Sequence, residues 1–136
     1  MFFTTARLTL RPVLPEDTSW LPALRDAPSV LDLSQFDSRL PPSVVLDSMG
    51  ECIGLVLIWP SAPSLWRIEF LLLDSARGQG YAQEMVRAWG HRFQQLCPGD
   101  NLEAHLQEGD EAALKVLRFA GFEPCGAGRY CLGGGL

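Results

Sequence analysis

The most chemically informative segment of this 136-residue chain is a glycine-bearing turn between an apolar run and a helical pattern. It reads Arg77-Gly78-Gln79-Gly80-Tyr81-Ala82 and follows the apolar residues 70–73. A helix N-terminus offers unpaired N–H groups and the positive end of the helix dipole, and glycines let a phosphate approach the backbone closely. The segment therefore indicates a pyrophosphate-binding turn, unless the glycines serve only the geometry of a strand-to-helix connection.

Three phosphate-binding patterns compete for this turn. A Walker loop requires a lysine directly after its last glycine, and none is present. A dinucleotide-binding fingerprint requires a third glycine where Gln83 stands, and it requires an alternating βαβ chain, whereas hairpin-like strand pairs precede this turn. The third pattern is an acyl-CoA-binding loop.

The elements on either side of the turn follow from the spacing of apolar residues. Residues 65–74 predict a strand, and because residues 70–73 are apolar on both faces, this strand belongs in the centre of a sheet. Tyr81, Met85, Trp89 and Phe93 recur every fourth residue and predict an amphipathic helix that Cys97-Pro98-Gly99 ends.

The rest of the chain predicts further strands and helices in irregular alternation. Pro15-Glu16-Asp17 indicates the start of a helix with Trp20, Leu21 and Leu24 on its apolar face, and a helical turn plus loop follows over residues 28–42. Strands are expected at residues 7–11, 43–47, 52–59, 102–106, 122–125 and 129–132, and a further helix is expected at 110–120. This order predicts an α+β fold: a mixed, mostly antiparallel central sheet flanked by helices, in a single compact domain over residues 1–136.

Composition excludes several classes of protein. The chain carries 11 basic and 16 acidic residues without a basic block, which disfavours nucleic acid as a partner. Its apolar run at residues 53–59 is too short to span a membrane, and the N-terminus lacks the basic start of a secretory signal, so we expect a cytoplasmic protein with no membrane partner.

The four cysteines, at positions 52, 97, 125 and 131, form no C-x-x-C pair and are not spaced with the two histidines as zinc ligands. Cys125 and Cys131 could face each other across a short hairpin. In a reducing compartment we expect reduced thiols, and we expect no metal.

Several motifs together resemble a known family. Residues 77–82 match the pattern Gln/Arg-x-x-Gly-x-Gly/Ala of the GNAT superfamily of acyl-CoA N-acyltransferases. Arg7-Leu8-Thr9-Leu10-Arg11-Pro12 with Pro15-Glu16-Asp17, and then residues 102–106, 110–117 and 120–123, are similar to the branch that includes ribosomal-protein N-terminal acetyltransferases. The resemblance extends over residues 5–132.

The resemblance implies acetyl-CoA as co-substrate, an amine acceptor (a small molecule or a protein N-terminus) and direct attack of the amine on the thioester, with no metal. A homodimer is an option. The thioester would lie where the strand at 65–74 and the strand at 102–106 diverge. The implied cofactor-binding residues are Leu71, Leu72, Leu73, Arg77, Gly78, Gln79, Gly80, Tyr81, Ala82, Gln83, Asp110 and Ala113.

Two residues depart from the family's usual pattern. Asp110 stands where the family usually has asparagine, and Leu117 stands where many members carry a tyrosine that protonates the departing thiolate. Together with the short segment between the first helix and the first hairpin, these departures motivate an alternative to the acetyltransferase, a non-catalytic acyl-CoA-binding module that acts by binding or oligomerisation.

A general base must accept the proton of the attacking amine. His105 is the first candidate, because the resemblance places it beside the thioester and histidine exchanges protons near neutral pH. Glu69 is the second. The alternatives are a solvated His105 on the polar side of its strand, and an ion pair of Glu69 with Arg67 or Arg129. His91 is expected at the surface.

The charge distribution suggests the class of acceptor. Residues 1–76 carry five basic and nine acidic side chains, and in this family that half contributes most of the acceptor side. A negative field concentrates cations, so a cationic amine is the expected acceptor. An acidic surface kept for solubility is the alternative.

Overall fold

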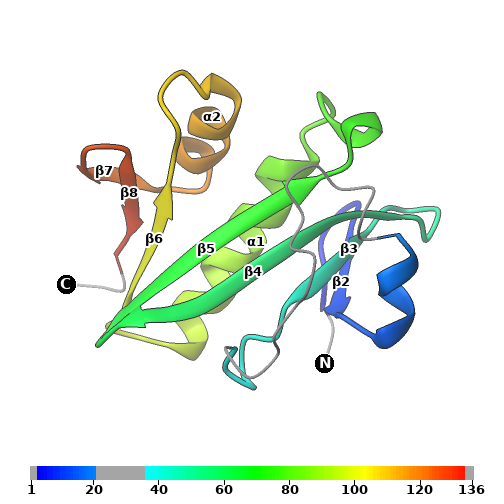
Figure 1. Ribbon diagram of the computed structural model, residues 1–136, viewed down its shortest axis with the longest axis horizontal. Coiled ribbons are helices and arrows are strands. Elements are labelled where there is room, and N and C mark those ends of the chain that lie inside the picture. The colour runs from blue at the N-terminus through cyan, green and yellow to red at the C-terminus, as the bar shows by residue number, and fades with distance from the viewer. Residues whose placement is uncertain (1–2, 21–35, 134–136) are drawn as a thin grey trace.

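One mixed sheet of eight strands organises the computed structural model, which describes residues 3–20 and 36–133 (Figure 1). The strand order is β1-β2-β3-β4-β5-β6-β8-β7, and every neighbouring pair is antiparallel except β5 and β6, which are parallel. The strands are β1 Phe3–Thr4, β2 Thr9–Pro12, β3 Ser43–Leu46, β4 Cys52–Ala62, β5 Leu65–Leu72, β6 Asn101–His105, β7 Glu123–Gly126 and β8 Arg129–Leu132.

Within residues 3–20 and 36–133, two α-helices accompany the sheet. Helix α1, Tyr81–Leu96, buries the side chains that recur every fourth residue, Met85, Trp89 and Phe93, as the periodicity predicts. Helix α2, Glu111–Phe119, buries Val116 and Leu117. The predicted α+β class with a mostly antiparallel sheet is therefore confirmed.

Apolar side chains cover both faces of the central strands. The larger cluster joins buried residues of β5 and β6, such as Ile68 and Leu102, to those of α1 and α2. A smaller cluster centres on Leu55 and Leu57 of β4, with Leu71 packed against it. Because side chains alternate along a strand, even-numbered residues of β5 face the helices and odd-numbered ones face the smaller cluster.

The start of the chain differs from the sequence-based expectation. Strand β1 was not expected, and the segment opened by Pro15 is a 3-10 helix, η1, over Pro15–Ser19. Leu21 and Leu24 were expected on the apolar face of this helix, and residues 28–35 in the helical turn and loop that follow it. All of these residues lie outside the described part of the chain.

Asp17 explains why this segment forms a tight turn. Its carboxylate is buried and accepts hydrogen bonds from the Arg11 guanidinium (both at 2.9 Å), the Leu14 N–H (2.7 Å) and the Trp20 indole N–H (2.8 Å). Burial alone raises the pKa of Asp17, but these hydrogen bonds outweigh it and lower the pKa to about 2. The sequence suggested Asp17 as an acidic residue in the first turn of a helix. In the structure, Asp17 is instead the centre of a hydrogen-bonded network.

The expectation of four reduced thiols is wrong for two cysteines, because Cys125 and Cys131 form a disulfide. The register between β7 and β8 shifts between Pro124 and Gly126, and this irregularity brings Cys125 within a Cα–Cα distance of 6.0 Å of Cys131. Cys52 and Cys97 are free thiols, and burial is the main cause that raises the pKa of each.

No helix within the described residues has the length and apolar character needed to cross a membrane.

Candidate functional site

The central strands of the sheet separate partway along their length. β5 and β6 pair from Leu65–Asn101 to Arg67–Glu103, and no pairing continues beyond that point. Figure 1 shows the two strands starting side by side and diverging toward the end that carries α2. A cleft of about 560 Å³ opens there, lined by β5, β6 and the first turns of α1 and α2.

This cleft brings together most of the residues singled out from the sequence, although their roles stay predictions. The predicted residues that line it are Glu69, Leu71, Leu72, Arg77, Gly78, Gly80, Tyr81, Ala82, Gln83, His105, Asp110 and Ala113. Leu73 and Gln79 are not among the lining residues. The Leu73 N–H donates to Ile53 O at 2.8 Å, and the Gln79 carbonyl accepts a hydrogen bond from Arg7.

The glycine-bearing turn presents an open helix N-terminus to the cleft. Gly78 and Gly80 have φ of 78° and 80°, a region that suits glycine, and Gly80 is the N-cap of α1. No side chain caps this end of the helix. The N–H groups of the first turn are therefore available to an anion, and the helix dipole favours it.

Arg7 fixes this turn from the outside. Its guanidinium donates to Gln79 O at 2.9 Å and to Glu84 at 2.8 Å, and it lies 4.5 Å from the centre of the Tyr81 ring. Glu84 also accepts hydrogen bonds from the Arg7 N–H and from the Thr5 hydroxyl. Burial alone raises the pKa of Glu84, but the hydrogen bonds from Thr5 and Arg7 outweigh it and lower the pKa. Arg7 therefore connects the first residues of the chain to the loop around Gly80.

The end of β5 leaves backbone groups unpaired along the cleft. Because the Leu73 N–H points to β4, strand alternation directs the backbone groups of Phe70 and Leu72 toward the diverging β6. The opposite position on β4 must be a glycine, since a Cβ on Gly54 would lie 2.7 Å from Leu71 O. Because the backbone groups of Phe70 and Leu72 are directed toward the cleft, an extended ligand could pair with β5 as an added strand.

Helix α2 contributes the opposite wall of the cleft. Asp110, expected to bind the cofactor, is the N-cap of α2, and its carboxylate accepts a hydrogen bond from the Ala113 N–H at 3.1 Å. Leu117 is fully buried in the core and does not line the cleft. Sequence reasoning missed Lys115, which does line it; the spacing of Ala112, Lys115 and Val116 along one helix face is the signal that could have found it.

Glu69 and His105 are exposed in the cleft and come from different strands. Among the described residues, no ion pair joins Glu69 to Arg67 or Arg129. His105 is not simply solvated, because its Nε2 hydrogen-bonds to Oε1 of the buried Glu103, another residue that sequence reasoning did not select. The cleft thus holds a carboxylate and an imidazole that can exchange protons with a bound molecule.

Comparisons with known proteins agree with this geometry. A family model described as an acetyltransferase (GNAT) domain matches residues 7–123. No curated protein matches the chain.

Solved structures share the fold at low sequence identity. An acetyltransferase of the GNAT family from Bacillus anthracis superposes with a TM-score of 0.77 at 13% identity, covering 98% of this chain and 99% of that one. A chimera of the spermidine N-acetyltransferase SpeG from Vibrio cholerae and hSSAT gives 0.76 at 16%, covering 95% and 96%. A protein assigned as a ribosomal-protein-serine acetyltransferase from Vibrio cholerae gives 0.71 at 14%, covering 98% and 97%.

Proposed function

The chain belongs to the GNAT acetyltransferase family, and from this premise we propose that its β5–β6 cleft binds acetyl-CoA and directs the acetyl group to a primary amine. One observation carries the proposal. A single cleft opens between the diverging strands β5 and β6 and also includes the uncapped N-terminus of α1. The whole chain, residues 1–136, would act as one domain. The sheet running from Phe3 to Leu132 supports this.

The cofactor would enter the cleft from the side of the helices. The N–H groups at the start of α1 would hold its pyrophosphate, with Gly78 and Gly80 permitting close approach. Lys115 adds positive charge to the same cleft, which Arg77, paired with Asp74 at 3.3 Å, also lines. The pantetheine arm would pair with the free backbone groups of Phe70 and Leu72 and so place the thioester between β5 and β6.

The acceptor amine would enter from the opposite face of the sheet, where the odd-numbered Glu69 and His105 lie. Its nitrogen attacks the thioester carbonyl, an N–C bond forms, and the C–S bond breaks. His105, or Glu69 in its place, accepts the proton that the amine loses, directly or through water. The departing thiolate takes a proton from water, since Leu117 is apolar and buried where the family often has tyrosine.

A cationic acceptor is favoured by the cleft rather than by the acidic first half as a whole. Asp17 is paired with Arg11 and Asp37 with Arg39, so neither is free to attract a ligand. Glu69, by contrast, lines the cleft from the odd-numbered face of β5, on the side proposed for the acceptor. A polyamine is a suitable first acceptor to test, and spermidine is named for the chimeric relative of this fold.

A panel of amines tests the proposal. Polyamines, amino acids and peptide N-termini are incubated with acetyl-CoA, and thiol release is measured together with the mass of the acetylated product. We expect at least one amine to release thiol and gain one acetyl group in equal amounts. Binding of acetyl-CoA without transfer to any amine would overturn the proposal in favour of an acyl-CoA-binding module.

A further inference from the structure

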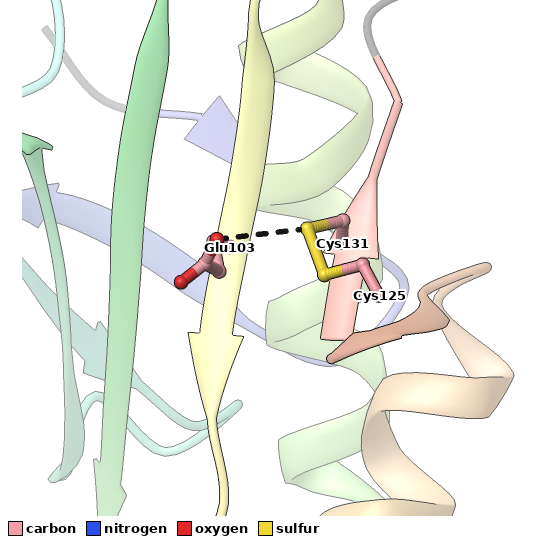
Figure 2. Close-up of side chains that lie close together, drawn as sticks. All are labelled: Glu103, Cys125 and Cys131. Atoms are coloured by element: carbon pink, nitrogen blue, oxygen red, sulfur yellow. Dashed lines mark hydrogen bonds between the residues drawn. A yellow bond between two sulfur atoms is a disulfide. The ribbon is translucent and has the colours of Figure 1, made fainter. Parts of the chain in front are cut away.

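A second cluster of reactive side chains lies beside the cleft (Figure 2). It consists of Glu103, Cys125 and Cys131, whose carboxylate oxygen and sulfur atoms all lie within 4.8 Å of one another. Glu103 is 8% exposed, Cys131 is half-buried and Cys125 is exposed. None of these three residues belongs to the proposed acetyl-CoA site.

The sheet itself assembles this cluster. Glu103 on β6 is the register partner of Cys131 on β8, so their side chains share one face of the sheet. The irregular register of β7 then brings Cys125 onto the same face, as described above. Residues more than twenty positions apart in sequence therefore form one local site.

The carboxylate of Glu103 links the disulfide to the cleft. Its Oε1 accepts a hydrogen bond from His105 Nε2, and its Oε2 lies 3.8 Å from Cys131 Sγ, the contact drawn as a dashed line in Figure 2. In the disulfide, Cys131 has no proton to donate to this oxygen. Among the described residues, His105 is then the only hydrogen-bond donor to the Glu103 side chain.

Reduction would change this balance. A buried carboxylate needs donors to offset its loss of water, and a Cys131 thiol would supply a second donor at Oε2. The negative carboxylate also disfavours a neighbouring thiolate, so Cys131 would remain a protonated thiol after reduction. The Glu103 carboxylate would then accept hydrogen bonds from two donors instead of one, and its hydrogen bond with the His105 ring would weaken.

We propose that Cys125 and Cys131 form a thiol–disulfide exchange site for dithiol reductants, and that its redox state is transmitted to the His105 ring through Glu103. An effect of this redox state on acetyl transfer would rest on the proposed function of His105. The exchange site and its coupling to the His105 ring do not depend on that proposed function.

The exchange step balances with a dithiol as reductant. A thiolate of the reductant attacks Sγ of the exposed Cys125, the S–S bond breaks, and the Cys131 sulfur leaves with the electron pair and takes a proton. The second thiolate of the reductant displaces Cys125, which also takes a proton. The protein gains two electrons and two protons, and the reductant becomes a disulfide.

A metal site is the competing interpretation of the same three residues. Two thiolates and a carboxylate are zinc ligands, and they would bind it only after the disulfide is reduced. The disulfide bond and the carboxylate–imidazole hydrogen bond favour the exchange site.

The experiment uses the full chain with dithiothreitol as the probe and no acceptor or acetyl-CoA. Alkylation without denaturant, followed by mass spectrometry, counts the free thiols before and after reduction. Nitrogen-15 spectra of the imidazole rings follow the only two histidines, of which the exposed His91 on α1 is the internal control. His91→Gln assigns the two sets of signals.

We expect reduction to free Cys125 and Cys131 for alkylation and to shift the ring signals of His105 but not those of His91. In Glu103→Gln, dithiothreitol should still reduce the disulfide. The shift of the His105 ring signals on reduction should, however, be less than about half of the wild-type shift. Cys125→Ser cannot form the disulfide, but it retains the Cys131 thiol and leaves Glu103 unchanged. Its His105 ring signals should match those of the reduced wild type.

Three results would overturn the proposal: a disulfide that dithiothreitol leaves intact in the folded protein, His105 signals that do not respond to reduction, or signals in Cys125→Ser that match the oxidised form. One zinc per chain in the reduced protein, with protection of both cysteines from alkylation, would overturn it in favour of a metal site. An inactive protein in the amine panel would leave all of these readouts unchanged.

Discussion

Glu69 and His105 occupy equivalent positions on the two parallel strands, each two residues beyond the last pair, Arg67 and Glu103. Residues in register on parallel strands point to the same face of the sheet, and both of these side chains line the cleft. The point at which β5 and β6 separate therefore carries a carboxylate and an imidazole from different strands. A substrate between the strands would meet both.

Replacing His105 by alanine should lower kcat by about 100-fold, because the residue is proposed to accept the proton of the amine. The KM for acetyl-CoA should change by less than about twofold, since the proposed cofactor site lies on α1 and β5. Steady-state kinetics with an acceptor from the amine panel measure both. His91→Ala is the matched control and should leave both constants unchanged.

Glu69→Gln separates the two candidate bases. If His105 is the base, Glu69→Gln should alter KM for a cationic acceptor more than kcat, because it removes a negative charge from the cleft. A normal kcat in His105→Ala together with a collapsed kcat in Glu69→Gln would contradict our first choice and assign the role to Glu69.

Arg7→Met should weaken acetyl-CoA binding by about tenfold, or about 1.4 kcal/mol, since it releases the turn that Arg7 fixes through Gln79 and Tyr81. Titration calorimetry measures the affinity. Arg39→Met is the control, because Arg39 also makes an ion pair and a ring contact, but its partners, Asp37 and Trp66, do not belong to the turn at the start of α1. Equal affinities in the two variants would show that Arg7 does not organise the site.

Asp17→Asn should cost about 2 kcal/mol of unfolding free energy at neutral pH. The carboxylate has a pKa lowered to about 2 in the fold, against 3.8 ordinarily, so it favours the folded state above pH 3.8. That contribution disappears as the pH falls from about 5 to about 2. Urea unfolding at pH 7 and pH 3 should show a smaller acid-induced loss in the variant than in the wild type. The same loss in both would refute this role of Asp17.

Local patterns predicted the parts of the fold that depend on neighbours in sequence. The helix that begins at Tyr81, its glycine turn and its end near Cys97 follow from periodicity and from glycine and proline alone. The central place of residues 65–74 followed from their apolar character on both faces. The cleft between this strand and the strand at residues 102–106, by contrast, was expected only from the resemblance to the GNAT superfamily.

Contacts between distant residues could not be predicted in the same way. The hydrogen bond from Arg7 to Gln79 joins residues 72 positions apart, and the disulfide depends on an irregular register between β7 and β8. Glu103 gave no local sign of importance, because its surroundings are set by β8 and by His105. Such partners are determined by strand order, and no local pattern encodes strand order.

The central claim, that the turn at the start of α1 holds the cofactor, is tested most directly by acetyl-CoA titration of Gly80→Glu beside Gly50→Glu. Both glycines have φ of 80°, so the two variants impose the same backbone strain, but Gly50 lies in the turn between β3 and β4 and does not line the cleft. A Cβ at position 80 would lie 3.3 Å from the Arg7 guanidinium, so glutamate there would disturb the turn and would add a negative charge beside the proposed pyrophosphate site. We predict that affinity falls at least about tenfold in Gly80→Glu and stays at the wild-type value in Gly50→Glu. Unchanged affinity in a folded Gly80→Glu variant would contradict the account.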